Sequence, residues 1–487
     1  MTTETLTDRA RWIALIVLCV GTLMIVLDTT VVNVALPSIQ RDLRFSASGL
    51  AWVMNAYLIA FGGLMLLAGR LGDLLSRRTI FLLGLVVFTT ASLVCGLASS
   101  SALLVGARFV QGVGGAMTAA VTLGMIVTMF PEPREQARAI GVYGFVASGG
   151  GTIGLLVGGA LTQAIDWHWI FFINLPIGVV TAAMAQRVLA FDRGVGLAAG
   201  ADVTGALLIT SALMLAVYTI VGPAAQDGWG AGITLIWGAV AIALLIGFVV
   251  REASAAHPLI PLRIFRSRTV TGANLVQALV VAGMFSMFFL GSLYLQRVLA
   301  FDALQIGLAF LPTTLIMGTL SLRYSEKLMT RFGPRALLVP GLVLIAAGLG
   351  LFTRVPVHGS YVRDVLPTLV LLGTGIGISF PSLMTLAMDG ATPEDAGLAS
   401  GLVNTTVQIG GALGLAVLAT LAASRSSSLV AAGTGTRAAL TGGYQLAFAV
   451  SAGLVVLALI VTVALLRPRR HPHHAAAMTR AECEAAA

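Results

Sequence analysis

Residues 12–36 read WIALIVLCVGTLMIVLDTTVVNVAL, an apolar run interrupted near its end by Asp28 and Asn33. A helix needs about 20 mostly apolar residues to cross the hydrocarbon core of a membrane, and this run is long enough. Arg9 and Arg11 precede it, as basic residues precede a signal peptide, but the run is too long for one and no small-residue cleavage site follows. The segment therefore predicts a membrane-spanning helix near the start of the chain.

The rest of the chain repeats this pattern. Of its 487 residues 57% are hydrophobic and only 10% are charged, whereas soluble domains carry about 25% charged residues. Further apolar runs occur at about 50–68, 79–98, 101–123, 139–162, 170–189, 203–221, 232–250, 268–295, 303–322, 335–353, 365–388, 399–423 and 444–466. We expect an all-α polytopic membrane protein with about 14 transmembrane helices.

The basic residues predict the orientation. An even number of helices places both ends of the chain on one side, and Lys and Arg concentrate in cytoplasmic segments. If the N-terminus is cytoplasmic, 21 of the 29 Lys and Arg residues fall in cytoplasmic segments, seven fall outside and Arg108 lies within a helix. We therefore expect a cell-membrane protein with both termini in the cytoplasm. This pattern accounts for the net charge of +9 without a nucleic-acid partner.

A weak internal repeat divides the chain. The loop after the second helix, GRLGDLLSRR at 69–78, is matched after the tenth helix by EKLMTRFGPR at 326–335. Repeated halves are typical of secondary transporters, whose binding site lies between the halves near the bilayer midplane. The expected domains are a six-helix bundle at 1–189, two inserted helices with linkers at 190–266, a second six-helix bundle at 267–466 and a cytoplasmic tail at 467–487.

Asp28 and Arg108 are the two charges placed well inside predicted helices. At about 1.5 Å per residue, both lie roughly 10–12 Å from the outer ends of their helices, so their depths match. A charge in the bilayer core normally faces a partner or a water-filled cavity. Burial and a nearby arginine change the proton affinity of an aspartate in opposite directions, so the pair predicts proton coupling. A static ion pair and direct contact with substrate are the alternatives.

Three charged residues, Asp73, Arg77 and Arg78, flank the cytoplasmic end of the second helix. A carboxylate at a helix end with two arginines beside it can latch neighbouring loops, which predicts a gate. Ordinary loop charge that sets the topology is the alternative explanation for the two arginines. It does not explain Asp73, because acidic residues contribute little to topology.

The predicted fifth helix carries a glycine face, with Gly150, Gly154 and Gly158 spaced by four and Gly159 adjacent. Small residues at this spacing let two helices approach closely. The face predicts close helix packing, and it also predicts a helix that seals the cytoplasmic side during transport. The two roles are compatible.

Amides and large side chains within predicted helices indicate a substrate pocket in the second half. These residues are Asn274, Gln277, Met284 and Phe288 on the ninth helix and Asn404 and Gln408 on the thirteenth. Amides in a membrane usually face protein or water, and methionine or aromatic linings suit varied organic ligands. A hydrogen bond between helices is the alternative for any single amide. Because no acid besides Asp28 is seen within the helices, we expect monocationic, zwitterionic or neutral amphiphiles as substrates.

No motif indicates an enzyme, a cofactor or a metal site. The chain has no Walker phosphate loop, so transport driven by ATP is not expected. The cysteines, Cys19, Cys95 and Cys483, are far apart and have neither disulfide nor metal-ligand spacing. The histidines at 471–474 are better explained by a polar tail than by a metal cluster.

Seven segments together resemble the Major Facilitator Superfamily, in particular its fourteen-helix drug:proton antiporters. They are Leu27–Pro37, Trp52–Tyr57 ahead of GRLGD, Arg108–Gly114, Trp167–Gly178, Tyr294–Gln296, Phe310–Pro312 and Gly397–Asn404. The resemblance extends over nearly the whole chain. It implies two six-helix bundles with two inserted helices, proton coupling through Asp28 and Arg108, and substrate contacts from Asn33, Asn55, Tyr57 and Gln111.

The chain departs from the superfamily pattern at two places. Leu74 and Ser76 stand where the loop motif usually has an arginine and a glycine, although the charges at 73, 77 and 78 match. In the fifth helix Leu155 replaces the proline of the antiporter motif. The first change implies a thinner charge network at the gate, and the second weakens the implied assignment to antiport rather than symport.

The sequence thus predicts a monomeric, proton-coupled antiporter that exports hydrophobic drugs or antibiotics from the cytoplasm by alternating access. Its partners would be a small amphiphilic organic substrate, protons and the lipid bilayer. A dedicated exporter of one endogenous metabolite is an alternative of the same class. A membrane sensor or scaffold that transports nothing is an alternative of another class, and the charged pair within the bilayer argues against it.

Overall fold

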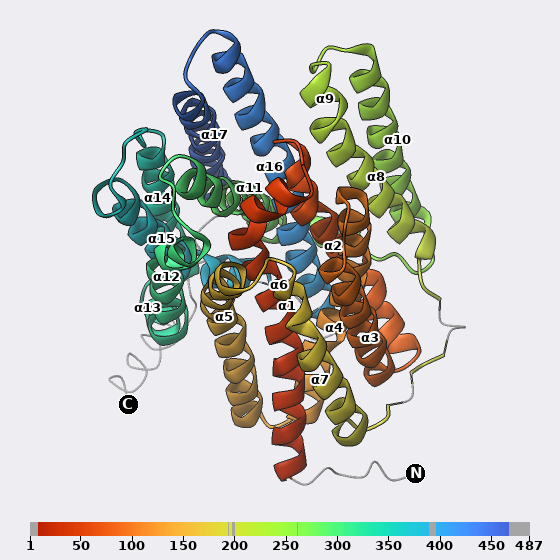
Figure 1. Ribbon diagram of the computed structural model, residues 1–487. Coiled ribbons are helices and arrows are strands. Elements are labelled where there is room, and N and C mark those ends of the chain that lie inside the picture. The colour runs from red at the N-terminus through yellow and green to blue at the C-terminus, as the bar shows by residue number, and fades with distance from the viewer. Residues whose placement is uncertain (1–7, 193, 197–199, 261, 389–395, 467–487) are drawn as a thin grey trace, which may run out of the picture.

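The structure is a computed structural model that describes residues 8–192, 194–196, 200–260, 262–388 and 396–466. All regular secondary structure in these ranges is helical (Figure 1). The first part of the chain contains α1 (Asp8–Asp42), η1 (Gly49–Ala51), α2 (Trp52–Leu74), α3 (Arg77–Gly96), α4 (Ser101–Met129), α5 (Pro133–Ala164), α6 (Trp169–Phe172) and α7 (Asn174–Val188).

Two further groups of helices follow along the chain. The middle part contains α8 (Val203–Val221), α9 (Pro223–Gln226), α10 (Gly232–Ser254) and η3 (Leu262–Arg266). The last part contains α11 (Arg268–Arg297), α12 (Ala303–Thr319), η4 (Leu320–Tyr324), α13 (Ser325–Phe332), α14 (Pro334–Phe352), η5 (Tyr361–Val365), α15 (Leu366–Ala387), α16 (Ala396–Ala431) and α17 (Thr436–Leu465). Side-chain hydrogen bonds cap the N-termini of some helices. The Ser76 hydroxyl accepts from the Thr79 N–H at the start of α3, and Asp302 forms a capping box with Gln305 at the start of α12.

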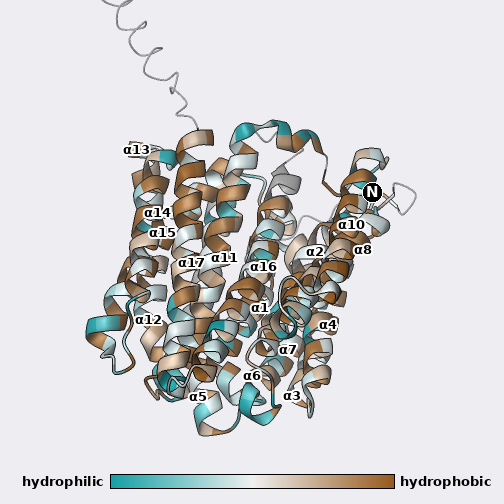
Figure 2. Cartoon of the chain, turned by 90° about the horizontal axis from the view of Figure 1, so that it is seen from above, coloured by the Kyte–Doolittle hydropathy of each residue, from teal (hydrophilic) through white to brown (hydrophobic). Residues whose placement is uncertain are grey.

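The helices match the predicted polytopic fold. Among the described residues, 13 helices are long and apolar enough to cross a membrane, and α12 is a shorter apolar helix in the position of the remaining predicted span. Figure 2 shows hydrophobic residues along the helices, with the hydrophilic residues gathered largely at helix ends and in loops. The fold class predicted from the apolar runs is therefore confirmed.

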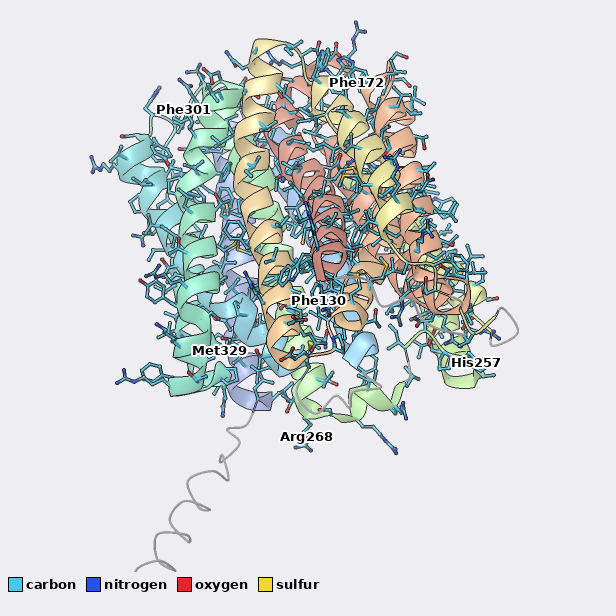
Figure 3. The ribbon with its side chains drawn as sticks, turned by 90° about the horizontal axis from the view of Figure 1, so that it is seen from below. Phe130, Phe172, His257, Arg268, Phe301 and Met329 are labelled. Atoms are coloured by element: carbon cyan, nitrogen blue, oxygen red, sulfur yellow. The ribbon has the colours of Figure 1, made fainter. Side chains whose placement is uncertain are left out.

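The connections separate into two ends of the molecule. The labelled residues of Figure 3 divide into Phe172 and Phe301 at one end and Phe130, His257, Arg268 and Met329 at the other. Trp12 near the start of α1 packs on Phe130, with ring centroids 5.1 Å apart. Arg335 at the start of α14 donates to the Val463 carbonyl near the end of α17 (3.1 Å). The first and last described helices therefore begin and end on the same side, as an even number of crossings requires.

Three details differ from the sequence prediction. The repeated segments at 69–78 and 326–335 were expected to be loops, but α2 continues to Leu74 and α13 occupies Ser325–Phe332. Helices can continue past the apolar region because their backbone groups are bonded internally, so hydropathy does not mark the helix end. The same applies to α10, which continues to Ser254 and includes the buried Glu252. The expectation that Asp28 is the only acid inside the membrane stays a prediction.

Glycines of α5 pack against α1 and α12, which are far apart in the sequence. A Cβ at Gly158 would lie 2.8 Å from Val31 Cα on α1, and Gly154 faces Thr30 one turn away. On another face of α5, a Cβ at Gly159 would lie 2.8 Å from the Ala303 carbonyl oxygen at the start of α12. The contacts are too close for any side chain. Helix α5 therefore holds α1 and α12 together through its backbone.

We predict that Gly158→Ala destabilises the protein. The new methyl group would meet the backbone of Val31, which cannot rotate away, so overpacking of about 1–3 kcal/mol is expected. The apparent melting temperature of the purified variant should fall. Gly149→Ala is the matched control on the same helix, because a Cβ there has nothing within 4 Å. Equal melting temperatures for the two variants would show that the close approach of α5 and α1 is not required.

Candidate functional site: a buried ion pair between α1 and α4

Asp28 on α1 and Arg108 on α4 form an ion pair in the first half of the chain. Arg108 Nη1 donates to Asp28 Oδ2, and neither residue has any exposed surface. The pairing agrees with the matched depths expected from the sequence. An isolated charge at such a place would be very unfavourable, so each residue depends on the other.

Two amides complete the coordination of the carboxylate. Gln111 Nε2 donates to Asp28 Oδ1 over 2.7 Å, and Asn174 Nδ2 from α7 donates to the same oxygen over 3.1 Å. Both amides also donate to the Ser92 hydroxyl oxygen on α3, over 2.7 Å and 3.3 Å. All three side chains around Asp28 therefore act as hydrogen-bond donors to its carboxylate.

The guanidinium of Arg108 is held on three sides. Its Nε donates to the Val53 carbonyl of α2 (2.9 Å), and Nη1 also donates to Gln111 Oε1 (2.7 Å). Its central carbon lies 4.5 Å from the centre of the Tyr57 ring, a distance suited to a cation–π contact. Arg108 Nη2 is buried and has no hydrogen-bond partner among the described residues. Arg108 Nη2 is therefore available to donate to another acceptor.

The other residues expected from the superfamily motifs lie in different situations. Tyr57 and Asn55 are fully buried, and neither the Tyr57 hydroxyl nor either amide atom of Asn55 has a hydrogen-bond partner among the described residues. Gln111 is occupied by the ion pair in this conformation. Asn33 is half-buried, and its Nδ2 donates to the Thr29 carbonyl of its own helix (3.0 Å).

Asn174 and Ser92 are the members of the network that the sequence analysis did not select. Asn174 lies in the aromatic-rich segment 167–178, so the resemblance to known antiporters contained a signal for it. Ser92 lies in an apolar helix among ordinary small residues, and nothing in the sequence distinguishes it. Both are fully buried and reach the site from α7 and α3.

The two candidate amides on α11 differ in their hydrogen bonding. Asn274 donates to the Val270 carbonyl (2.9 Å) and accepts from the Thr406 hydroxyl of α16 (3.0 Å). The second bond is an interhelical hydrogen bond, the alternative to a role in the substrate pocket. Gln277 is 1% exposed, and its Nε2 has no hydrogen-bond partner among the described residues. Gln277 is therefore the candidate amide best placed to accept a new partner.

Met284 and Phe288 contribute apolar surface to this region. Met284 is buried, and the half-buried Phe288 packs on Phe310 with ring centroids 5.4 Å apart. Gln408 on α16 lies against α2, where a Cβ at Gly62 would be 2.8 Å from its own Cβ. Asn404 is half-buried on the same helix.

The three charges of the predicted gate are bonded within the first half of the chain. Arg77 Nη2 donates to Asp73 Oδ1 over 2.9 Å, and Arg77 Nη1 donates to the Gly124 carbonyl of α4 over 3.5 Å. Arg78 Nη2 donates to the Gln186 carbonyl of α7 over 2.5 Å. The cluster thus ties α2, α3, α4 and α7 together at the end of the molecule that holds Phe130.

Asp192, in the linker after α7, completes this cluster and was not anticipated. It accepts from the Ser76 hydroxyl (2.7 Å) and from the backbone N–H groups of Arg77 (2.9 Å) and Arg78 (3.2 Å). Partial burial raises the pKa of Asp192, but these hydrogen bonds outweigh it and hold the pKa below its usual range. The N–H groups of Gly194 and Gly196 then bond to the carbonyls of Leu75 and Leu74 (2.9 Å each).

Among the described residues, no group of three or more His, Cys, Asp or Glu side chains is placed to hold a metal ion. Cys19 and Cys95 are buried free thiols. Cys483 and the histidines at 471–474 lie outside the described residues.

We predict that Asp192→Asn loosens the linker. The asparagine lacks the negative charge at the start of α3, and a hydrogen bond to a charged group is worth about 1.5–3 kcal/mol. Amide hydrogen exchange at residues 194–196 should be about tenfold faster or more in the variant at pH 7. Because the pKa of Asp192 is lowered on folding, its contribution is present at neutral pH and is lost as the pH falls through the acid range. The difference from the parent protein should therefore shrink below about pH 4.

Asp227→Asn provides the control, since Asp227 is an exposed loop acid at the other end of α8. Unchanged exchange at 194–196 in Asp192→Asn would contradict the role assigned to Asp192.

Comparison with known proteins identifies the family. The model of the Major Facilitator Superfamily matches residues 18–415. Puromycin resistance protein pur8 of Streptomyces alboniger is 38% identical over 95% of this chain and 92% of its own length, and cephamycin export protein CmcT of Amycolatopsis lactamdurans is 38% identical over 92% and 91%. A solved bacterial homologue of the human lysosomal transporter Spinster, inward-facing and unoccupied, has the same fold with a TM-score of 0.69 at 15% identity, over 96% of this chain and all of that one. The chain is a membrane transporter of the Major Facilitator Superfamily.

Proposed function

We propose that this transporter exports small amphiphilic organic molecules, antibiotics among them, from the cytoplasm in exchange for protons. Related proteins of nearly the same length are named for puromycin resistance and cephamycin export. We further propose that the segments 1–189 and 267–466 are the two moving halves, that 190–266 supplies the inserted pair, and that one chain is the working unit.

The buried network of Asp28 is the observation that carries the proton-coupling proposal. With Asp28 ionised, its oxygens accept from Arg108, Gln111 and Asn174. A proton on the carboxylate would remove the charge that holds Arg108 and leave three donors with a weaker acceptor. The two protonation states therefore favour different packings of α1 against α4 and α7, which is the differential interaction that coupling requires.

The closed surroundings of the pair define when a proton can be exchanged. Neither Asp28 nor Arg108 has exposed surface in this conformation, so a proton can arrive or leave only in another state of the transport cycle. A coupling site must be closed in this way at some stage, because a site open to both sides would let protons leak without transport.

Leu155, which replaces the usual proline, lies in the α5–α12 contact, where its carbonyl faces Gly307.

The chemistry around the network supports uncharged, zwitterionic or monocationic substrates. Asp28 and Arg108 neutralise each other, so the pair has no net charge to attract a dication. Unpartnered polar groups of Asn55, Tyr57 and Gln277 are available to orient a ligand, and Met284 offers an adaptable apolar surface. Polar groups placed sparsely in an apolar setting are characteristic of small-molecule sites.

Export of a single metabolite is a second candidate within the same class. The names of several relatives each specify one antibiotic, such as cephamycin, tetracenomycin C or lincomycin. A panel of structurally unrelated compounds, tested for export by cells that lack their own pumps, separates the two candidates. Export of one compound and none of its unrelated competitors would favour the dedicated exporter.

The orientation can be tested with thiol labelling. If both termini are cytoplasmic, Cys483 in intact cells is shielded from a membrane-impermeant thiol reagent, while a cysteine at the opposite end reacts. Ser360→Cys supplies that position, because Ser360 is exposed and the neighbouring Tyr361 ring lies 6.2 Å from Phe301. Cys19 and Cys95 are 3% and 0% exposed, so they contribute little background. Labelling of Cys483 from outside together with protection of Ser360→Cys would reverse the orientation.

The coupling proposal predicts a specific loss in Asp28→Asn. Asparagine keeps the size of the side chain but cannot bind and release a proton. In proteoliposomes with a pH gradient and no ATP, the parent protein should accumulate substrate and the variant should not, although it still binds substrate. Arg108→Lys should also be severely impaired, because lysine cannot donate to Val53, Asp28 and Gln111 in one plane.

Expression and melting temperature of the same purified variants separate coupling from stability. A purely structural pair predicts that Asp28→Asn lowers stability first, since Arg108 is left buried without its counter-ion. A stable Asp28→Asn protein that still concentrates substrate in proportion to the proton gradient would place the coupling elsewhere. Accumulation that requires ATP and no ion gradient would overturn the energy source as well.

A further inference from the structure

Two more buried carboxylates lie at the ends of α8 and α10 that face the linkers 200–202 and 255–260. Asp202 caps the first turn of α8 and is 2% exposed, and Glu252 lies in the last turns of α10 and is 3% exposed. Helices α8 and α10 pack against each other. Neither residue belongs to the Asp28 network or to the gate cluster.

The two carboxylates have unequal partners. Asp202 Oδ1 accepts from the Gly205 N–H (2.9 Å) and from Arg251 Nε (3.1 Å), which completes an ion pair. Glu252 Oε2 accepts from the Ile260 N–H over 2.9 Å. Glu252 Oε1 is buried and has no hydrogen-bond partner among the described residues.

The free oxygen of Glu252 faces the same point as Asp202. A Cβ built on Gly205 would lie 2.8 Å from Asp202 Oδ2 and 2.9 Å from Glu252 Oε1, so both oxygens lie within 3 Å of one position. Only a residue without a side chain leaves this space open. The two oxygens thus approach one point, and Glu252 Oε1 receives no hydrogen bond there from the described residues.

When Asp202, Glu252 and Arg251 are all ionised, this site carries more negative than positive charge. Arg251 supplies one positive charge against the two carboxylates, and the excess negative charge is buried. Two other basic groups contact the adjacent linker: Arg70 Nε donates to the Gly200 carbonyl (3.1 Å), and a Cβ at Gly200 would lie 2.7 Å from His257 Cδ2. Desolvation and a neighbouring like charge both favour a neutral carboxyl group.

We propose that Glu252 is a second proton-binding site of this protein, with the bound proton on Oε1 directed toward Asp202 Oδ2. A proton there removes the excess charge, gives the unpartnered oxygen a hydrogen bond, and leaves the Asp202–Arg251 ion pair intact. Arg251 stays with Asp202, because its Nε is already within 3.2 Å of both carboxylate oxygens.

The site is connected to the contact between the two halves of the transporter. Leu259 and Ile260 line a cavity of about 250 Å³ together with Gly62 and Leu66 of α2 and Thr405 of α16. The backbone of Ile260 is held by Glu252. A neutral carboxyl is a weaker acceptor than a carboxylate, so proton binding at Glu252 relaxes its hold on a wall of this cavity.

Infrared spectroscopy of the purified full-length protein tests the proposal without any transport measurement. Exposed glutamates lose their proton near pH 4.3, so a protonated-carboxyl carbonyl band that persists at pH 7 reports a buried neutral acid. The band should be present in the parent protein and absent from Glu252→Gln. It should remain in Asp28→Asn, and in Glu135→Gln, where a partly exposed glutamate paired with Arg11 is replaced.

A second variant keeps the test decisive if Glu252→Gln does not fold. Asp202→Asn removes the neighbouring negative charge, so the band should disappear at a pH at least one unit lower, equivalent to a tenfold weaker affinity for the proton. Absence of the band from the parent protein at pH 7, or a band unchanged in Glu252→Gln, overturns the proposal. Loss of the band when sodium chloride replaces choline chloride would assign the site to a metal cation and also overturn it. None of these outcomes depends on coupling through Asp28.

Discussion

The pairing of Asp28 with Arg108 places two opposite charges where neither could remain alone. The groups that bond to the pair come from three helices: Gln111 from α4, Asn174 from α7 and the Val53 carbonyl from α2. The first half of the transporter is therefore assembled around a polar centre as much as around its apolar surface. Under the proposed coupling, one proton on Asp28 would change hydrogen bonds that reach α2, α4 and α7.

Much of this architecture could be predicted from the sequence because a spanning helix is defined by its own residues. The apolar runs locate the helices, and the matched depths of Asp28 and Arg108 indicate that they meet. The network partners Asn174 and Ser92 could not be found in the same way, since which face of α7 or α3 turns toward α1 is decided by packing between distant segments. Helix ends were also misplaced, because the backbone bonds that continue α10 as far as Glu252 do not depend on hydropathy.

The glycine contacts of α5 join α1 and α12 to it. Its backbone meets α1 at Gly158 and α12 at Gly159, and the carbonyl of Leu155 meets Gly307 in return. Contacts made by backbone rather than by long side chains have few adjustable atoms. Under the proposed alternating access, such contacts would let one helix tilt against another without the withdrawal of interlocking side chains. Leucine in place of proline also retains the backbone N–H at that turn of α5.

The linker that follows α7 has a consequence for any attempt to shorten this chain. Three residues of this linker do more than connect two helices: Asp192 bonds to the start of α3, and Gly194 and Gly196 bond to the end of α2. A shorter transporter made by excising 190–266 and rejoining the bundles would lose the cap of α3 together with the excised helices. A derivative of this chain without residues 190–266 would therefore need a replacement acceptor at the start of α3.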